Sequence, residues 1–313
     1  MNICRAGILM CILFLHQQLY AQFSYKELQV DYESIWTYKN LQLIPVKFKQ
    51  RGEGAPNGLP AAKGPLSFSE ALLKHKINVE EIQYKNGADA NWLQVTNKSN
   101  QNIIIQSGEI VEGGKQDRMI AETKFIAPGK TDYLNVFCIE KRRWDKNPKS
   151  FKHRGVGNSK VRKAMDVSKR QSQVWKEIDN QFAEKNKKSE TWSYLQLENA
   201  ATVDTGYIRY FTKKYIEDTS NIAGFIFITG NQIISTEIFA TEALLKISFD
   251  QLLSSYVQTV VTKGAPPKVL QTTVTAFMDN ILLTEEAQKK YIAEHGKIFF
   301  SDGRKIHLVA YGN

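Results

Sequence analysis

The sequence predicts an α+β fold in which strands and helices occupy different parts of the chain. Short runs with strand-like alternation, separated by turn residues, fill the N-terminal half. Longer runs with helical periodicity dominate the C-terminal half, together with β-hairpins. Short turns join antiparallel neighbours, because parallel strands need a long crossover. We therefore expect an antiparallel β meander followed by helices and hairpins, rather than alternating β-α-β units.

The first 21 residues have the layout of a secretory signal peptide. Arg5 precedes the apolar run Ile8–Leu15, and a short polar stretch ends at Ala21. This run is too short to cross a bilayer. We expect cleavage after Ala21 and an exported protein, either periplasmic or secreted. No later segment reaches about 20 consecutive apolar residues, so no transmembrane helix is expected in the mature chain.

The mature chain, 22–313, is expected to form a single α+β domain. A hydrophobic content of 42% is enough for a substantial core. Cys138 is the only cysteine left after processing, so an intrachain disulfide is excluded and the core must stabilise the fold. We divide the domain into a β-rich part (22–140), a basic helical segment (141–188) and a C-terminal α/β part (189–313).

The β-rich part contains a series of strand patterns. Pro45 in the first pattern favours a sheet edge, and the Gly/Pro-rich stretch 51–65 must be a loop. Ser67 or Ser69 is expected to cap a short helix. The expected strands are Asn40–Gln50, Val79–Tyr84, Asn91–Thr96, Asn102–Gln106, Glu109–Glu112, Lys115–Ile126 and Tyr133–Glu140.

Helical patterns and hairpin turns alternate in the rest of the chain. A helix is expected from Ser159 to Glu184, and another over 204–218. Gly230-Asn231 and Asp302-Gly303 are typical two-residue hairpin turns. Between these hairpins the sequence predicts an amphipathic helix capped by Thr241 and a further helical stretch that ends near residue 294.

The positive charge is concentrated in one segment. The formal net charge is +10, and residues 141–188 contain sixteen Lys/Arg against five Asp/Glu. Such a segment suits a phosphate-bearing ligand or an anionic envelope surface. Export makes nucleic acid an unfavourable partner. The alternative is a solvated face that serves only solubility.

The stretch "GEIVEGGKQDRMI", residues 108–120, is either a ligand-binding loop or a pair of hairpin turns. It is not a P-loop, because glutamate stands where the first glycine is needed and Gln116 where serine or threonine is needed. Gln116, Arg118 and Ile120 would share one face of the following strand. A buried arginine needs a paired acid or a bound anion. Glu109 and Glu140 are the candidate acids.

A second candidate stretch is "VFCIEKRRW", residues 136–144. Arg143 beside Trp144 could bind a phosphate or carboxylate while the indole stacks on a planar ring. The alternative is an Arg–Glu pair with a packed tryptophan at the end of a strand. Cys138 could be a nucleophile, but a lone cysteine on an apolar strand is usually a small core residue.

Other classes of site have no support in the sequence. A nucleophile elbow and a zinc-protease helix motif are both missing, and no cofactor motif is found. The mature histidines are scattered without metal-type spacing, so we expect no metal centre: His75, His153, His295 and His307.

Two spaced motifs resemble one bacterial family. The pattern G-E-x-x-x-G-x-K-Q-[N/D]-R spans 108–118, and C-x-E-x-x-R-W follows over 138–144. Together with the block 223–261, they resemble the ARG/rhodanese/phosphatase-superfamily-associated domain, whose activity is unassigned. The resemblance implies ligands related to ADP-ribose or nucleotides and supplies no catalytic residue. This chain differs in its expected export and its Lys-rich segment.

These patterns lead to one principal hypothesis and two alternatives. The principal hypothesis is a binding domain for an anionic small molecule, with Arg118 and Arg143 clamping the anion. The first alternative is a hydrolase for a phosphate-bearing or ADP-ribose-like substrate, with Glu109 or Glu140 as general base. The second is a non-catalytic structural or envelope-interaction protein. The expected ligand-binding residues are Glu109, Lys115, Gln116, Arg118, Glu140, Arg143 and Trp144.

Overall fold

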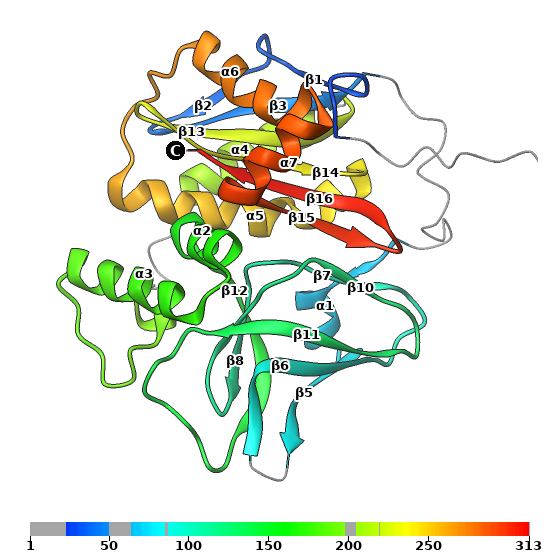
Figure 1. The fold of residues 1–313 in the computed structure, drawn as a ribbon, viewed down its shortest axis with the longest axis vertical. Coiled ribbons are helices and arrows are strands. Elements are labelled where there is room, and N and C mark those ends of the chain that lie inside the picture. Colours follow the sequence, from blue (N-terminus) through cyan, green and yellow to red (C-terminus); the bar gives the residue numbers. More distant parts are fainter. Residues whose placement is uncertain (1–22, 50–63, 85–86, 198–204, 219, 313) are drawn as a thin grey trace, which may run out of the picture.

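The computed structural model has two lobes, one mixed and one rich in β structure (Figure 1). It describes residues 23–49, 64–84, 87–197, 205–218 and 220–312. The expected signal peptide therefore lies outside the described residues. Within them, the strand pairs are antiparallel except for β4 (Leu66–Ser67) with β7 (Ile103–Ile105). Strands dominate the N-terminal half and helices the C-terminal half, which confirms the α+β class.

The mixed lobe is built on a seven-stranded antiparallel sheet. Its order is β1-β3-β13-β14-β16-β15, and β2 also pairs with β3. The N-terminal strands thus join the C-terminal hairpins, a long-range pairing that the sequence did not indicate. The strands are β1 (Leu28–Val30), β2 (Trp36–Tyr38), β3 (Leu41–Phe48), β13 (Ile222–Thr229), β14 (Gln232–Phe239), β15 (Gly296–Ser301) and β16 (Arg304–Tyr311).

Four helices cover this sheet. Phe249 and Tyr256 of α5 pack on Phe225 and Phe227 of β13. Because all of β13 except its last residue is buried, both faces of the central sheet are covered. Thr241 caps α5 as expected, through a hydrogen bond from the Leu244 N–H. The helices are α4 (Thr205–Glu217), α5 (Glu242–Lys263), α6 (Gln271–Leu282) and α7 (Glu285–His295).

The β-rich lobe is a six-stranded sheet that curls into an incomplete barrel. Its order is β12-β8-β9-β11-β6-β5. Apolar residues from all six strands form one buried cluster, with β7 and the helix α1 (Phe68–Leu73). The edge strands β5 and β12 come close without pairing. The strands are β5 (Ile77–Tyr84), β6 (Gly87–Asn97), β8 (Glu109–Gly114), β9 (Arg118–Ile120), β11 (Thr131–Cys138) and β12 (Lys149–Val156).

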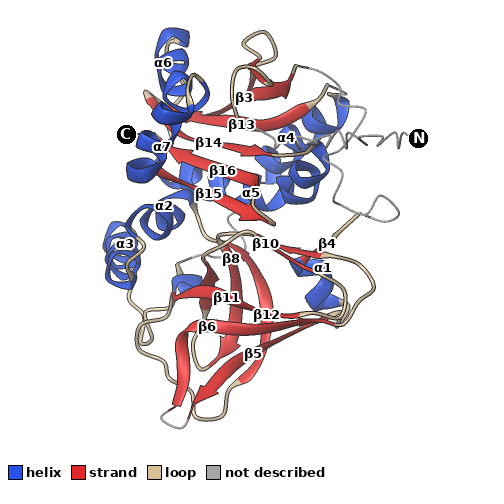
Figure 2. Ribbon diagram, turned by 45° about the vertical axis from the view of Figure 1, so that its right-hand side comes forward, coloured by secondary structure: helices blue, strands red, loops and turns tan. Residues whose placement is uncertain are grey.

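Smaller elements lie between the barrel and the mixed lobe (Figure 2). A three-stranded sheet contains β4 (Leu66–Ser67), β7 (Ile103–Ile105) and β10 (Lys124–Ile126). The outer face of β8 and β9 packs through Ile110 and Met119 against α2 (Ser159–Ser168) and α3 (Gln171–Glu184). A short 3₁₀ helix, η1 (Tyr194–Gln196), follows.

Several local expectations are wrong, each for a physical reason. The helix expected over 159–184 is two helices, because Lys169 adopts a left-handed conformation (φ 54°). The strand expected over 115–126 is split into β9 and β10, which belong to different sheets. Pro45 is not at a sheet edge. It lies in a strand paired on both sides, between the stretches that pair with β2 and β1. The strand β12 was missed in the basic segment.

A buried polar network joins the two lobes. Arg162 of α2 forms an ion pair with Glu237 of β14 (Nη1–Oε1 2.8 Å), and both side chains are almost completely buried. His307 of β16 contacts Glu237 at 2.9 Å and Thr123 of the β-rich lobe at 3.1 Å. Gly108 has φ +92°, and a Cβ there would lie 2.7 Å from Arg162 Nε. Glycine is thus required where the lobes meet.

The ion pair predicts an acid-sensitive fold. Burial alone would raise the pKa of Glu237, but the charge of Arg162 and the hydrogen bond with His307 lower it to about 2. A carboxylate with a lowered folded pKa stabilises the fold above its unfolded pKa and loses this contribution as the pH falls through the folded value. We expect the Glu237 contribution, on the order of 3 kcal/mol, to be lost between about pH 5 and pH 2.

Denaturant unfolding between pH 7 and pH 2 of the wild type and Glu237→Gln measures this effect. The comparison is needed because burial raises the pKa of the nearby Asp166, which acts in the opposite direction. The wild type should lose more stability on acidification than the variant. Parallel curves for the two proteins would contradict the role given to Glu237.

Candidate functional site

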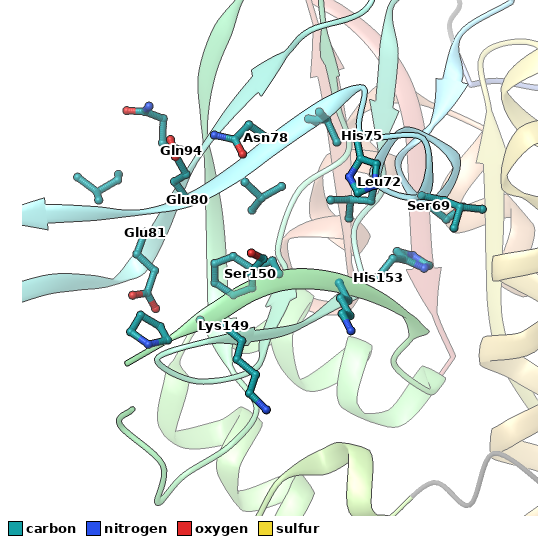
Figure 3. Close-up of a pocket in the computed structure, with 18 of the residues that line it drawn as sticks. Ser69, Leu72, His75, Asn78, Glu80, Glu81, Gln94, Lys149, Ser150 and His153 are labelled. Carbon is teal, nitrogen blue, oxygen red and sulfur yellow. The ribbon is translucent and has the colours of Figure 1, made fainter. Parts of the chain in front are cut away.

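The incomplete barrel leaves an opening between its edge strands β5 and β12, which we call the seam pocket. Its volume is about 1230 Å³. Figure 3 shows Glu80 and Glu81 toward one end and His75 and His153 toward the other. The pocket follows the line along which the six-stranded sheet would close into a barrel, with α1 contributing Ser69, Leu72 and Leu73.

The seam pocket is lined by charged and amide side chains over an apolar interior. Strand β12 contributes Lys149 and Lys152, which are exposed, and the half-buried His153. Strand β5 contributes the exposed Glu80 and the half-buried Glu81. The basic segment thus supplies one wall of the pocket and an acidic pair lies on the other. This arrangement suits a polar ligand that carries at least one negative charge.

Glu109 lies behind this pocket and supports His153. Its Oε1 is 3.0 Å from His153 Nε2, and its Oε2 accepts a hydrogen bond from the Gln106 N–H at 2.7 Å. His153 Nδ1 accepts a weaker hydrogen bond from the Gly155 N–H at 3.3 Å. Both carboxylate oxygens and both ring nitrogens are therefore engaged within the protein.

Arg143 is the centre of a second cluster, at the end of the barrel that carries Gly113 and Gly114. Its Nε donates to Glu140 Oε2 at 2.6 Å, and its Nη2 donates to Asp117 Oδ1 at 2.8 Å. Burial would lower the pKa of Arg143, but the hydrogen bond and charge of Glu140 and the charge of Asp117 raise it. The expected Arg–Glu pair is thus present, and Asp117 is a second acid that the sequence reasoning missed.

The same guanidinium binds Gly113 and Gly114, which end β8 and do not form the expected two-residue turn, since Gly114 pairs with Lys149 of β12. Arg143 donates to the Gly114 carbonyl at 2.9 Å and to the Gly113 carbonyl at 3.2 Å. Gly114 has φ +54°, and a Cβ there would lie 2.2 Å from the Phe151 ring. Glycine is required at this position, and Gly114 lines the seam pocket as the last residue of β8 rather than as part of a ligand-binding loop.

Arg118 is fully buried and lacks a matching acid. Only its Nη1 has acceptors, namely Gln116 Oε1 at 3.1 Å and, more weakly, the Asp117 carbonyl at 3.5 Å. Its Nε and Nη2 have no hydrogen-bond partner among the described residues. Burial lowers the pKa of Arg118, while Cys138 and the Glu81 charge act against this effect. Neither Glu109 nor Glu140 pairs with Arg118, because Glu109 is bound to His153 and Glu140 to Arg143.

Glu81 connects Arg118 with the seam pocket. It lines the pocket, and its Oε1 accepts a hydrogen bond from the Lys115 N–H at 2.7 Å. Its Oε2 is buried and has no partner among the described residues. The alternation Ile77, Val79, Glu81 along β5 places this carboxylate on the apolar, inward face. That pattern is a signal by which the sequence could have revealed it.

The remaining candidates lie around these groups. The exposed Trp144 has Lys115 Nζ 5.6 Å from its ring centroid, which is a cation–π contact. Cys138 is buried, its thiol donates to the Glu140 carbonyl, and burial raises its pKa, as expected for a core thiol. The structure thus brings Gln116, Arg118, Glu140 and Arg143 together in a closed cluster. It leaves Glu109 apart and Trp144 at the surface.

Metal ligands and membrane-spanning helices can be assessed for the described residues. Within the described ranges, no three His, Cys, Asp or Glu side chains are grouped as metal ligands. No helix in that part of the chain is long and apolar enough to cross a membrane. Both oxygens of Glu109 and the Oε2 of Glu140 lie within hydrogen-bonding distance of protein groups.

Arg143→Met tests the structural role of the second cluster. The change leaves Asp117 and Glu140 buried without their cation, so we expect a loss of about 2–3 kcal/mol in the free energy of unfolding. Lys141→Met is the matched control, because Lys141 forms an exposed pair with Asp179 and should cost less than about 1 kcal/mol. Denaturant unfolding measures both, and equal losses would contradict the assignment.

Comparison with known proteins identifies the family. A family model described as the ARG and Rhodanese-Phosphatase-superfamily-associated Protein domain matches residues 29–311. The chain therefore belongs to this family, as the paired motifs at 108–118 and 138–144 suggested. No curated protein matches the chain significantly, and neither does any solved structure.

Proposed function

We propose that this family member is exported and binds an anionic small molecule, phosphate- or nucleotide-derived, beside Arg118 and through the seam pocket. One observation carries the proposal. The Arg118 guanidinium is completely buried, and its Nε and Nη2 have no partner among the described residues. A buried charge without a counter-charge is strongly unfavourable, so a protein that retains one gains stability when an anion arrives.

The surroundings of Arg118 favour an incoming anion over an internal one. Asp117 and Glu140, the nearest candidates in sequence, are both bound to Arg143. Lys149 and Lys152 are exposed at the seam pocket and would attract an anion toward it. Since Arg118 has no exposed surface, the ligand must displace side chains of the pocket wall to reach it.

In this proposal the other expected residues act mainly as supports. Gln116 holds Arg118 through Nη1, and Arg143 with Glu140 fixes the end of β8 beside the pocket. Glu109 orients His153 at the pocket wall. Hydrolysis of an ADP-ribose-like substrate, the alternative, would need one of these bound carboxylates to be released. Binding without turnover requires no such rearrangement and is the function that we favour.

Arg118→Met tests the proposal, because it should preserve the stability of the ligand-free protein and abolish the stabilisation by a ligand. Replacing an unpaired buried cation by an apolar side chain should leave the melting temperature of the ligand-free protein unchanged or raise it. A ligand at about 100 times its dissociation constant should stabilise the wild type by about 2.7 kcal/mol, and the variant not at all. Thermal shift with inorganic phosphate, sugar phosphates, nucleotides and ADP-ribose measures both effects.

Lys289→Met, an exposed change in the mixed lobe, is the control and should bind as the wild type does. A flat response of the wild type to every compound would argue against anion binding. The same conclusion would follow if Arg118→Met retained the ligand-induced shift.

A second candidate function, which we also propose, is attachment to an anionic envelope surface through the basic segment. In residues 141–188 ten Lys/Arg are exposed, whereas Glu184 is the single exposed acid of that segment. Lys141 and Arg142 lie over the rings of Trp175 and Trp192, at 5.9 and 5.4 Å from the ring centroids. Basic and aromatic groups together suit a membrane interface with anionic headgroups.

Sedimentation with lipid vesicles tests this second candidate. We expect binding to vesicles that contain phosphatidylglycerol, none to pure phosphatidylcholine, and loss of binding at high salt because exposed charges are screened. Reversing the charges of Lys146, Lys169 and Lys176 should weaken binding at least tenfold. The same reversal at Lys246, Lys268 and Lys290, which are exposed elsewhere, is the control. Equal effects of both triple variants would show that vesicle binding depends on the overall charge of the protein and not on the basic segment.

A further inference from the structure

The charge of Glu81 acts on Arg118, and the unpartnered atoms of these two side chains comprise donors and an acceptor. On the guanidinium they are Nε and Nη2, which form the edge that binds two oxygens of a carboxylate or phosphate side by side. On β5 the unpartnered atom is Oε2 of Glu81, an acceptor, while its Oε1 is held by the Lys115 N–H. A simple oxyanion would satisfy Arg118 and leave Glu81 Oε2 without a donor.

We infer that the ligand of this site carries a hydrogen-bond donor next to its oxyanion, as sugar phosphates do; hydroxy acids and amino acids present the same pair of groups and serve as small probes. The oxyanion would lie on the Nε/Nη2 edge of Arg118, and the donor, a hydroxyl or an ammonium group, would bond to Glu81 Oε2. This inference rests on the proposed function and adds the chemical class of the ligand.

Burial makes the site selective for ligands that satisfy both Arg118 and Glu81. Glu81 is half-buried at the pocket wall and its Oε2 is shielded from solvent. A buried acceptor that loses its donor incurs a desolvation cost, so a site of this kind rejects ligands that lack the donor. A bare carboxylate or alkyl phosphate would also bring a second negative charge beside Glu81 without a proton between the two groups.

A direct Arg118–Glu81 ion pair is the competing explanation. The described residues contain no such pair within 4.0 Å, since Arg118 takes part in none of the ion pairs between them. If the two side chains nevertheless paired in solution, each single substitution would break a buried ion pair and lower stability strongly. The double variant Arg118→Met/Glu81→Gln would then lose less than the sum of the two single losses.

Matched ligand pairs test the inference by calorimetric titration. Propionate is compared with lactate and alanine, and propyl phosphate with glycerol 3-phosphate, so that each pair differs only in its donor groups. We expect the ligands with a donor to bind the wild type at least tenfold more tightly, in line with a hydrogen bond to a charged group. In Glu81→Gln an amide NH₂ replaces Oε2, and this preference should disappear.

Glu190→Gln is the matched control, because Glu190 is an exposed carboxylate that does not line the seam pocket. It should retain the full preference. Equal affinities within each pair, or a preference that survives Glu81→Gln, would overturn the inference while leaving Arg118-dependent anion binding intact. Failure of every compound to bind the wild type would overturn the proposed function as well. If the double variant lost less stability than the sum of the two single losses, Arg118 and Glu81 would be paired with each other and the site would not be available to a ligand.

Discussion

The structure depends on how buried and half-buried guanidinium groups are neutralised. At the junction of the lobes, Arg162 is matched by Glu237, and His307 and Tyr256 complete the bonds of that carboxylate. At the end of the barrel, Arg143 is matched by two carboxylates and two carbonyl oxygens. Arg118 has the same need for a counter-charge, but the described protein groups supply only neutral acceptors. The first two arrangements explain stability, and the third points to a ligand.

The incomplete barrel explains how an unpaired arginine such as Arg118 can lie close to a pocket. Its edge strands do not pair, so the sheet stays open along one line and polar groups on its inward face come near solvent. The second cluster keeps this opening in shape, because Arg143 binds the backbone of Gly114 at the end of β8.

The sequence predicted the fold class and most hairpins, because local turn chemistry determines them. It also selected Gln116, Arg118, Glu140 and Arg143, which do form one cluster. It could not predict which acid pairs with which arginine, because that depends on long-range strand order. The pairing of β1–β3 with β13 was invisible for the same reason. Strand β12 was missed because its lysines alternate with few apolar residues.

The central claim is that an anion binds directly to the Nε/Nη2 edge of Arg118. Nuclear magnetic resonance of the arginine side-chain Nε–H groups observes this edge, with the Arg118 signal assigned by its absence from Arg118→Lys. Titration with a stabilising anion should shift the Arg118 signal by far the most and slow its exchange with water, as expected for a charge-assisted hydrogen bond. An Arg118 signal that stays in place while the signals of surface arginines move would contradict the claim.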